Sequence, residues 1–289
     1  KEENKYALKI LDLWRMKPSD HLDFSQRFKE GYKAGLIQSE YLVKNHSFGY
    51  LEDNPYLIMD YCSNGSLSKH KEKFYNYAAS ENLMAHILGG LKALHRNGFI
   101  HRDLKPENII VKGNKVKILD YGISKVIDYT ALTSTGNFLG SPLYSSPEQI
   151  TDSKNIDKRS DLYTLGVILY EMLTSRLPYE FNNLPELIDK IKNESPIPPR
   201  KYFAEITNKF ENIIFKLLEK NPYQRYLNID ELISIFQSNE NIPRREYDTT
   251  PRFMLRLYDD GTAMKKYIET HTHPMLVEFP AIQQIRQKT

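Results

Sequence analysis

One loop of this chain reads His101-Arg102-Asp103-Leu104-Lys105-Pro106-Glu107-Asn108, and downstream a strand-like stretch ends in Asp120-Tyr121-Gly122. A γ-phosphoryl group in transfer carries negative charge on its oxygens. Its site therefore needs a carboxylate for the attacking hydroxyl, a positive charge for the phosphate and oxygen ligands for Mg²⁺. Four side chains match these needs in order: Asp103, Lys105, Asn108 and Asp120.

Each of these residue types is also common in turns, where Asp and Asn side chains cap the local backbone. The surrounding sequence favours a shared site instead. Residues 109–111 are apolar, and residues 116–119 are apolar except for Lys117. The two stretches flank Lys112-Gly113-Asn114, which predicts a hairpin that returns Asp120 beside Asn108. One amide and one carboxylate suit Mg²⁺, which prefers hard oxygen ligands and keeps several waters.

The octapeptide resembles the catalytic loop of the eukaryotic-type (Hanks-type) serine/threonine protein kinases, and residues 120–122 resemble their DFG triplet with Tyr for Phe. The resemblance implies an α+β bilobal fold with a small, mostly-β N-lobe, truncated before the third strand, and a larger, mostly-α C-lobe. It places the catalytic domain at 1–237, with the N-lobe at about 1–59, the hinge at 60–65 and the C-lobe at 66–237.

The same resemblance implies roles and cofactors. Asp103 would accept the proton of a protein Ser or Thr hydroxyl, and Lys105 would steady the phosphate. Asn108 and Asp120 would hold the Mg²⁺ of ATP.

Residues 5–10 read as a strand that is similar to the family's V-A-I-K element, so Lys9 would bind the α- and β-phosphates. Its expected ion-pair partner is Glu30, at the family's usual spacing. The alternative is two solvated surface charges. Gly31 and Gly35 weaken the helix around Glu30, which suggests the hypothesis that this helix is a regulatory element.

Residues 55–62 form an apolar strand that runs into a polar segment, which looks like the hinge between kinase lobes. The correspondence makes Met59 the gatekeeper, with the backbones of Asp60 and Cys62 bonding the adenine. Ala7 and Ile110 would enclose the ring. The alternative is an ordinary buried strand followed by a turn.

Residues 120–148 resemble an activation segment that ends in Ser146-Pro147-Glu148. Ser141 would contact Asp103 and Lys105. A phosphate in the run Thr133-Ser134-Thr135 could pair with Arg102, although such hydroxyls also occur in plain solvated loops.

Two further landmarks are structural. Asp161 is expected to bond the backbone of the catalytic loop, and Arg225 is expected to pair with Glu148.

The chain begins at Lys1 without the glycine-rich loop that normally covers the phosphates. A missing stretch outside this sequence explains that more easily than a natural loss. A catalytically impaired pseudokinase that acts as a scaffold remains the alternative. A small-molecule kinase is disfavoured, because such enzymes generally lack a peptide-binding segment like 120–148.

Composition is compatible with this interpretation. The 289 residues carry a formal net charge of +3, which is too mild to suggest nucleic-acid binding. The single cysteine, Cys62, excludes an intrachain disulfide and fits a reducing, cytoplasmic location, and no apolar run is long enough to span a bilayer. Residues 238–289 read as a linker and appendage that could dock a regulatory partner. A metal site at His271 and His273 with Glu278 is disfavoured, because the sequence supports neither the number of ligands nor the residues that would orient them.

Overall fold

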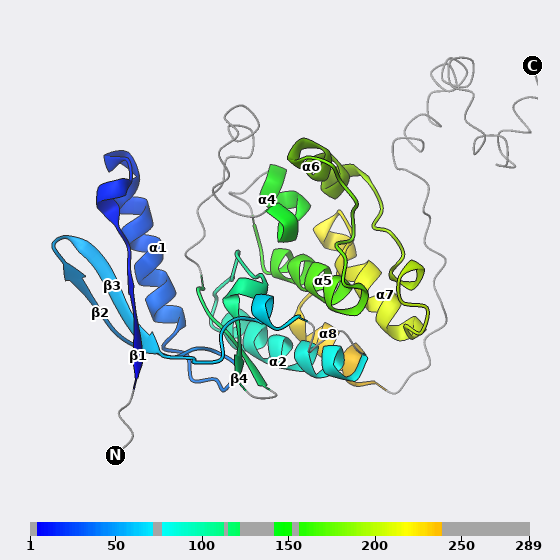
Figure 1. Ribbon diagram of the computed structural model, residues 1–289, viewed down its shortest axis with the longest axis horizontal. Coiled ribbons are helices and arrows are strands. Elements are labelled where there is room, and N and C mark those ends of the chain that lie inside the picture. Colours follow the sequence, from blue (N-terminus) through cyan, green and yellow to red (C-terminus); the bar gives the residue numbers. More distant parts are fainter. Residues whose placement is uncertain (1–4, 72–76, 113–114, 122–141, 152–155, 239–289) are drawn as a thin grey trace, which may run out of the picture. The chain divides into compact units, whose positions relative to one another are not determined.

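The computed structural model describes residues 5–71, 77–112, 115–121, 142–151 and 156–238 (Figure 1). Several predicted features lie outside these ranges: Gly122, the hydroxyl run Thr133, Ser134 and Thr135, Ser141, and all of the appendage after Ser238.

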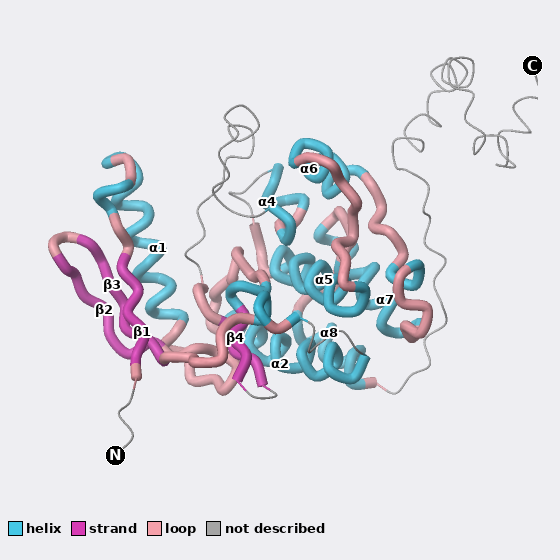
Figure 2. Tube along the Cα trace, in the orientation of Figure 1, coloured by secondary structure: helices cyan, strands magenta, loops and turns pink. Residues whose placement is uncertain are grey.

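The N-terminal part is a three-stranded antiparallel sheet with the α-helix α1 (His21–Ala34) and two short 3₁₀ helices, Leu13–Arg15 and Pro18–Asp20 (Figure 2). The strands are β1 (Tyr6–Ile10), β2 (Asn45–Leu51) and β3 (Asn54–Asp60), in the order β1-β3-β2. Burial alternates along β3, as expected for a strand with one face in the core. Helix α1 buries Phe28, Gly31 and Ala34, a stripe at helical spacing.

The C-terminal part is mostly helical. Within the described residues, its α-helices are α2 (Tyr77–Arg96), α4 (Pro147–Thr151), α5 (Arg159–Thr174), α6 (Leu184–Asn193), α7 (Asn208–Leu217) and α8 (Ile229–Gln237). Strands β4 (Ile109–Lys112) and β5 (Lys115–Ile118) form the predicted hairpin. The fold is therefore the predicted α+β arrangement, a small sheet region followed by a larger helical one. Among the described residues, no helix is both long and apolar enough to cross a membrane.

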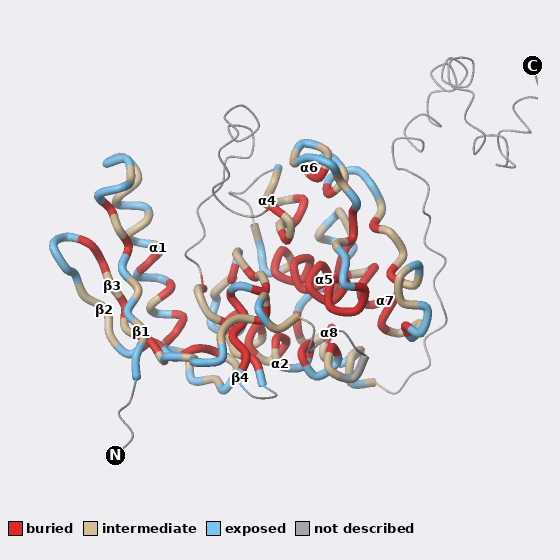
Figure 3. The backbone as a smooth tube through the Cα atoms, viewed as in Figure 1, coloured by how far each residue is buried: buried red, intermediate tan, exposed pale blue. Residues whose placement is uncertain are grey.

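Helix α5 forms the centre of the helical core, and Figure 3 shows it buried along nearly its whole length. Gly166 lets α7 approach closely, because a Cβ at this position would lie 2.8 Å from the Cβ of Leu217. Even Asp161, at the start of α5, is only 1% exposed. A buried carboxylate needs compensating partners, and Asp161 finds them in the catalytic loop and in His95 of α2.

Residues 41–43 join the sheet region to the β4–β5 hairpin. Ile118 N donates to Tyr41 O at 2.8 Å, and Val43 N donates to Ile118 O at 2.9 Å. These bonds form an isolated parallel bridge between Leu42 and Ile118. Asp120 follows shortly after Ile118. These hydrogen bonds therefore hold the backbone that leads to Asp120, a predicted metal ligand.

Candidate active site

The predicted catalytic residues meet on one loop. Lys105 Nζ lies 2.9 Å from Asp103 Oδ2. The Asn108 side-chain amide donates to the carbonyl oxygen of Asp103 at 2.8 Å and to its Oδ2 at 3.0 Å. Pro106–Asn108 form one 3₁₀ turn, which returns the chain so that Asn108 faces Asp103.

The orientation of Asn108 suits a metal ligand. Its NH₂ group is committed to Asp103, so its Oδ1 is left for another partner. Leu119 N donates to Asn108 O at 2.9 Å, which places the residue before Asp120 directly beside Asn108. Asn108 and Asp120 together offer hard oxygen donors from adjacent strand ends, a donor set that fits Mg²⁺.

Asp161 binds the backbone of the catalytic loop, as expected. It accepts hydrogen bonds from the backbone N–H groups of His101, at 2.8 Å, and of Arg102, at 2.9 Å. His95 Nε2 lies 2.8 Å from the same carboxylate. Burial raises the pKa of Asp161, but bonding to His95 and the positive potential of His95 and His101 outweigh burial, so its pKa lies below the ordinary value. The carboxylate is therefore charged at neutral pH.

Two residues of the site have left-handed backbones: Arg102 has φ +67° and Asp120 has φ +66°. Such conformations cost non-glycine residues about 1–3 kcal/mol and persist only where neighbouring contacts hold them. Arg102 directly precedes the predicted catalytic residue Asp103, and Asp120 is itself a predicted metal ligand. The chain therefore has a left-handed residue directly before Asp103 and another at Asp120 itself.

The predicted ion pair between Lys9 and Glu30 is absent from the structure. Lys9 Nζ lies 2.6 Å from Asp120 Oδ1 instead, and Glu30 is exposed on α1. The rotation of α1 explains this difference. Successive helical residues turn by about 100°, so Glu30 lies about 200° around the helix from the buried Phe28. Glu30 thus faces away from the core, and Asp120 is the carboxylate within reach of Lys9.

Except for Asp60, the residues predicted to surround adenine share one apolar cluster. Met59 and Ile110 are each 8% exposed, and Ala7 and Cys62 pack against the same cluster. Ala7 pairs directly with Met59 across β1 and β3. The amide of Asp60 is bonded to Lys44 O, at 2.9 Å. Burial raises the pKa of the Cys62 thiol.

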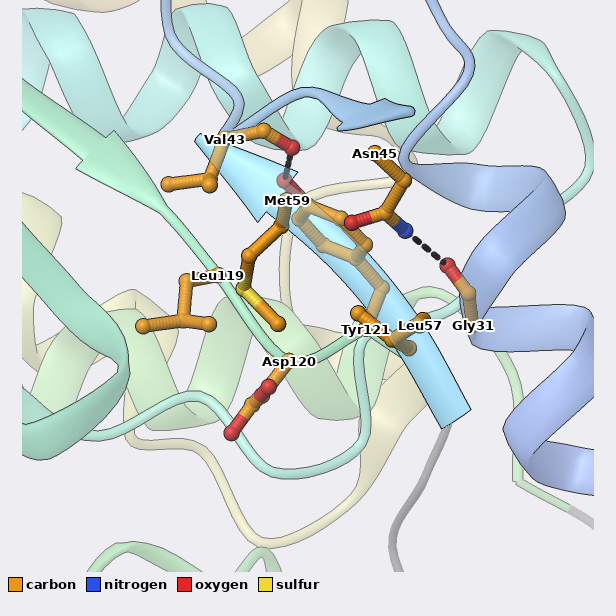
Figure 4. Close-up of a pocket in the computed structure, with 8 residues that line it drawn as sticks. All are labelled: Gly31, Val43, Asn45, Leu57, Met59, Leu119, Asp120 and Tyr121. Carbon is orange, nitrogen blue, oxygen red and sulfur yellow. Dashed lines mark hydrogen bonds between the residues drawn. The ribbon is translucent and has the colours of Figure 1, made fainter. Parts of the chain in front are cut away.

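A small pocket lies behind Met59 and reaches Asp120 (Figure 4). Its other lining residues are Gly31, Val43, Asn45, Leu57, Leu119 and Tyr121. The Tyr121 hydroxyl contacts the carbonyl oxygen of Val43, and the Asn45 amide donates to Gly31 O at 3.1 Å, near the end of α1. The pocket therefore borders the sheet, α1 and the predicted metal ligand together.

The predicted ion pair between Glu148 and Arg225 is present and bidentate. Arg225 donates to Oε1 at 2.6 Å and to Oε2 at 2.8 Å. Its guanidinium also donates to the carbonyl oxygens of Arg159, Glu219 and Lys220. The Arg225 side chain is 0% exposed, so this cation depends on those partners and on the Tyr163 ring, whose centroid lies 4.9 Å from its Cζ.

Sequence reasoning missed three features of the site. Two of them are the contact of Lys9 with Asp120 and the bond of His95 to Asp161. Both join residues that are far apart in the sequence, so no local sequence pattern predicts them. The third is the contact of Gln149 with Arg102, for which the run Ser146-Pro147-Glu148-Gln149 gave a partial signal, because Ser and Gln at this spacing form a capping box.

A model of the protein kinase domain matches residues 1–234. The chain is 34% identical over 248 residues to the serine/threonine-protein kinase pkn3 of Myxococcus xanthus, in a match that covers 81% of this chain and 45% of that protein. It is 33% identical over 236 residues to the serine/threonine-protein kinase PknB of Mycobacterium leprae, covering 78% and 37%. It therefore spans less than half the length of these curated relatives. With the catalytic-loop geometry, these matches show that the chain belongs to the protein kinase domain family.

Proposed function

We propose that this chain is the catalytic domain of a serine/threonine protein kinase, which transfers the γ-phosphoryl group of Mg-ATP to Ser or Thr hydroxyls of protein substrates. The observation that carries the proposal is the contact set of Asp103 with Lys105 and Asn108. The catalytic domain would comprise residues 1–237.

In the proposed reaction, Asp103 orients the incoming hydroxyl and accepts its proton, because its carboxylate lies beside a cation and is partly open to solvent. Lys105 Nζ lies beside the Asp103 carboxylate, so it would be able to bind both this carboxylate and the phosphoryl group during transfer. When bound, Mg²⁺ would neutralise charge that develops on the phosphate oxygens. Asn108 and Asp120 would hold it through their oxygens.

ATP would lie against the apolar cluster of Ala7, Met59 and Ile110, with the backbones of Asp60 and Cys62 at the edge of the base. Lys9 would leave Asp120 to bind the α- and β-phosphates, and Glu30 would then become its partner through movement of α1. Arg102 is exposed beside Asp103, which supports the proposal that a phosphorylated activation segment could pair with it.

The test is phosphate transfer from γ-labelled ATP to a generic protein substrate in the presence of Mg²⁺. Asp103→Asn is expected to reduce kcat by at least a hundredfold, the lower range for a general base, while nucleotide affinity changes little. Asp53→Asn is a matched control, because Asp53 is exposed in the β2–β3 turn at φ +63°, which Asn also tolerates.

Nucleotide binding without any transfer by the unaltered chain would contradict the proposal and support the scaffold alternative. Equal rates for the chain and for Asp103→Asn would also contradict it, because transfer would then come from another group or from a contaminant.

A further inference from the structure

Gln149, in the short helix α4, contacts both its own helix start and the catalytic loop. Its Oε1 accepts a hydrogen bond from Ser146 N at 2.9 Å, and its backbone N–H donates to Ser146 Oγ at 3.3 Å. These reciprocal bonds form a capping box. The remaining end of the side chain, Nε2, donates to the carbonyl oxygen of Arg102 at 2.7 Å. A single amide therefore links the start of α4 to the residue that precedes Asp103.

Arg102 is held from both sides of its backbone. Its N–H donates to Asp161 of α5, and its carbonyl accepts from Gln149 of α4. Between these contacts its φ is +67°, a left-handed value that residues other than Gly, Asn and Asp rarely adopt. An unfavourable backbone conformation persists only where contacts over-determine it, and these two hydrogen bonds supply contacts on each side.

Gln149 follows a residue that is held by a buried ion pair. Its neighbour Glu148 is bound by both guanidinium ends of Arg225, and the Arg225 side chain is fully buried. The amide of Gln149 is thus presented to Arg102 from an anchored helix, and the assignment of Nε2 as the donor follows from the acceptor nature of the Arg102 carbonyl.

We propose that Gln149 is a positioning residue for Asp103: by holding the Arg102 carbonyl, it keeps the left-handed turn that aims the Asp103 carboxylate at Lys105 and Asn108. Relaxation of Arg102 to an ordinary φ would rotate the following peptide and move Asp103 away from its partners. Misplacement of a reacting group by about 1 Å can lower a rate by about a hundredfold. This inference rests on the proposed kinase function.

Gln149→Glu separates the two tasks of the side chain. A Glu at this position retains an oxygen that accepts from Ser146 N, as in the Ser/Glu capping box. It replaces the Nε2 donor with an oxygen that faces the Arg102 carbonyl. Gln149→Met has similar length and removes both polar ends without adding charge. Ser146→Ala is the matched control, because it removes the Ser146 hydroxyl from the cap and leaves the Gln149 contact with Arg102 in place.

The expected result is a fall in kcat of about tenfold for Gln149→Glu and Gln149→Met, equivalent to about 1.4 kcal/mol. The KM for ATP should stay within about twofold in both, because the predicted nucleotide contacts are unaltered. Gln149→Glu should keep a near-normal Tm, and Ser146→Ala should lower Tm but keep kcat within about twofold. An unchanged kcat in either Gln149 variant would overturn the proposal. So would a kcat that follows Tm across all three variants, since that is the behaviour of a purely structural residue.

Hydrogen exchange of the peptide that contains Arg102 and Asp103 tests the contact without catalysis. Faster exchange there in Gln149→Glu than in Ser146→Ala is expected, because only the first variant releases Arg102. Equal exchange would overturn the positioning role. If the unaltered chain transfers no phosphate, the proposed function fails, whereas the exchange comparison still decides whether Gln149 holds the loop.

Discussion

The Tyr121 hydroxyl lies 2.7 Å from the carbonyl oxygen of Val43, and an equal distance separates it from the carbonyl oxygen of Ile118. Val43 belongs to the segment that enters β2, and Ile118 ends β5, so the hydroxyl bridges the two parts of the fold beside Asp120. The His101 ring packs edge-on against the Tyr121 ring at 6.0 Å between centroids. Burial raises the pKa of Tyr121 well above its ordinary value, so the hydroxyl remains protonated and able to donate at physiological pH.

Tyr121→Phe should destabilise the chain by about 1–2 kcal/mol, because it keeps the ring but leaves buried carbonyl oxygens without this donor. The same change should weaken Mg²⁺-dependent nucleotide binding. Without its hydroxyl, the side chain at position 121 no longer bonds Val43 and Ile118, and the neighbouring Asp120 is then held less firmly. Urea unfolding and nucleotide titration measure these effects. Tyr50→Phe is the control, because Tyr50 is 60% exposed. Equal stability of the two variants would show that the Tyr121 hydroxyl contributes nothing to the junction.

The catalytic loop could be predicted from sequence because its contacts are local. Asp103, Lys105 and Asn108 lie on one short turn, and the hairpin signal at residues 112–114 correctly predicted that the chain returns toward Asn108. The resemblance to the protein kinases also predicted the long-range pair of Glu148 with Arg225, which is present in the structure. Each of these predictions depended on a motif that carries its own geometry.

The contacts that could not be predicted from the sequence depend on how helices and strands are oriented against one another in the packed fold. Glu30 has the expected spacing from Lys9, but the orientation of α1 is set by the burial of Phe28 and its stripe, and it turns Glu30 toward solvent. Gln149 and Arg102 are 47 positions apart, and their contact exists only after α4 is anchored. Such outcomes are decided by tertiary packing rather than by local propensity.

Glu148→Gln should destabilise the chain by about 3–5 kcal/mol, because it leaves the fully buried Arg225 guanidinium without a counter-charge. Chemical unfolding at neutral pH measures the difference. Lys92→Gln is the comparison, because Lys92 forms a partly exposed pair with Asp230 and should change stability by less than about 1 kcal/mol. If the free energy of unfolding fell by the same small amount in both variants, the Arg225 network would be no stronger than a surface ion pair.

Asp161→Asn should destabilise the chain at neutral pH, because the charged carboxylate binds His95 and two loop amides. The pKa of Asp161 is lower in the folded state than its ordinary value, so its stabilisation is complete above that value and is lost as pH falls through the folded pKa. The difference in unfolding free energy between the unaltered chain and Asp161→Asn should therefore become smaller below about pH 4. Urea unfolding at a series of pH values tests this. An advantage at pH 3 as large as at pH 7 would contradict a lowered pKa.

Glu30→Gln should separate the conformation described here from the one proposed for catalysis. In the structure Lys9 is bound to Asp120 and Glu30 is exposed, so the substitution should leave Tm unchanged. If α1 moves to pair Glu30 with Lys9 when ATP binds, the same substitution should lower kcat/KM for ATP by about tenfold, near the effect of losing one charge-assisted hydrogen bond. Glu81→Gln, at an exposed position of α2, is the control for the change of charge. A loss of Tm in Glu30→Gln would mean that Glu30 already has a partner in the resting chain, and unchanged kcat/KM would mean that Lys9 acts without it.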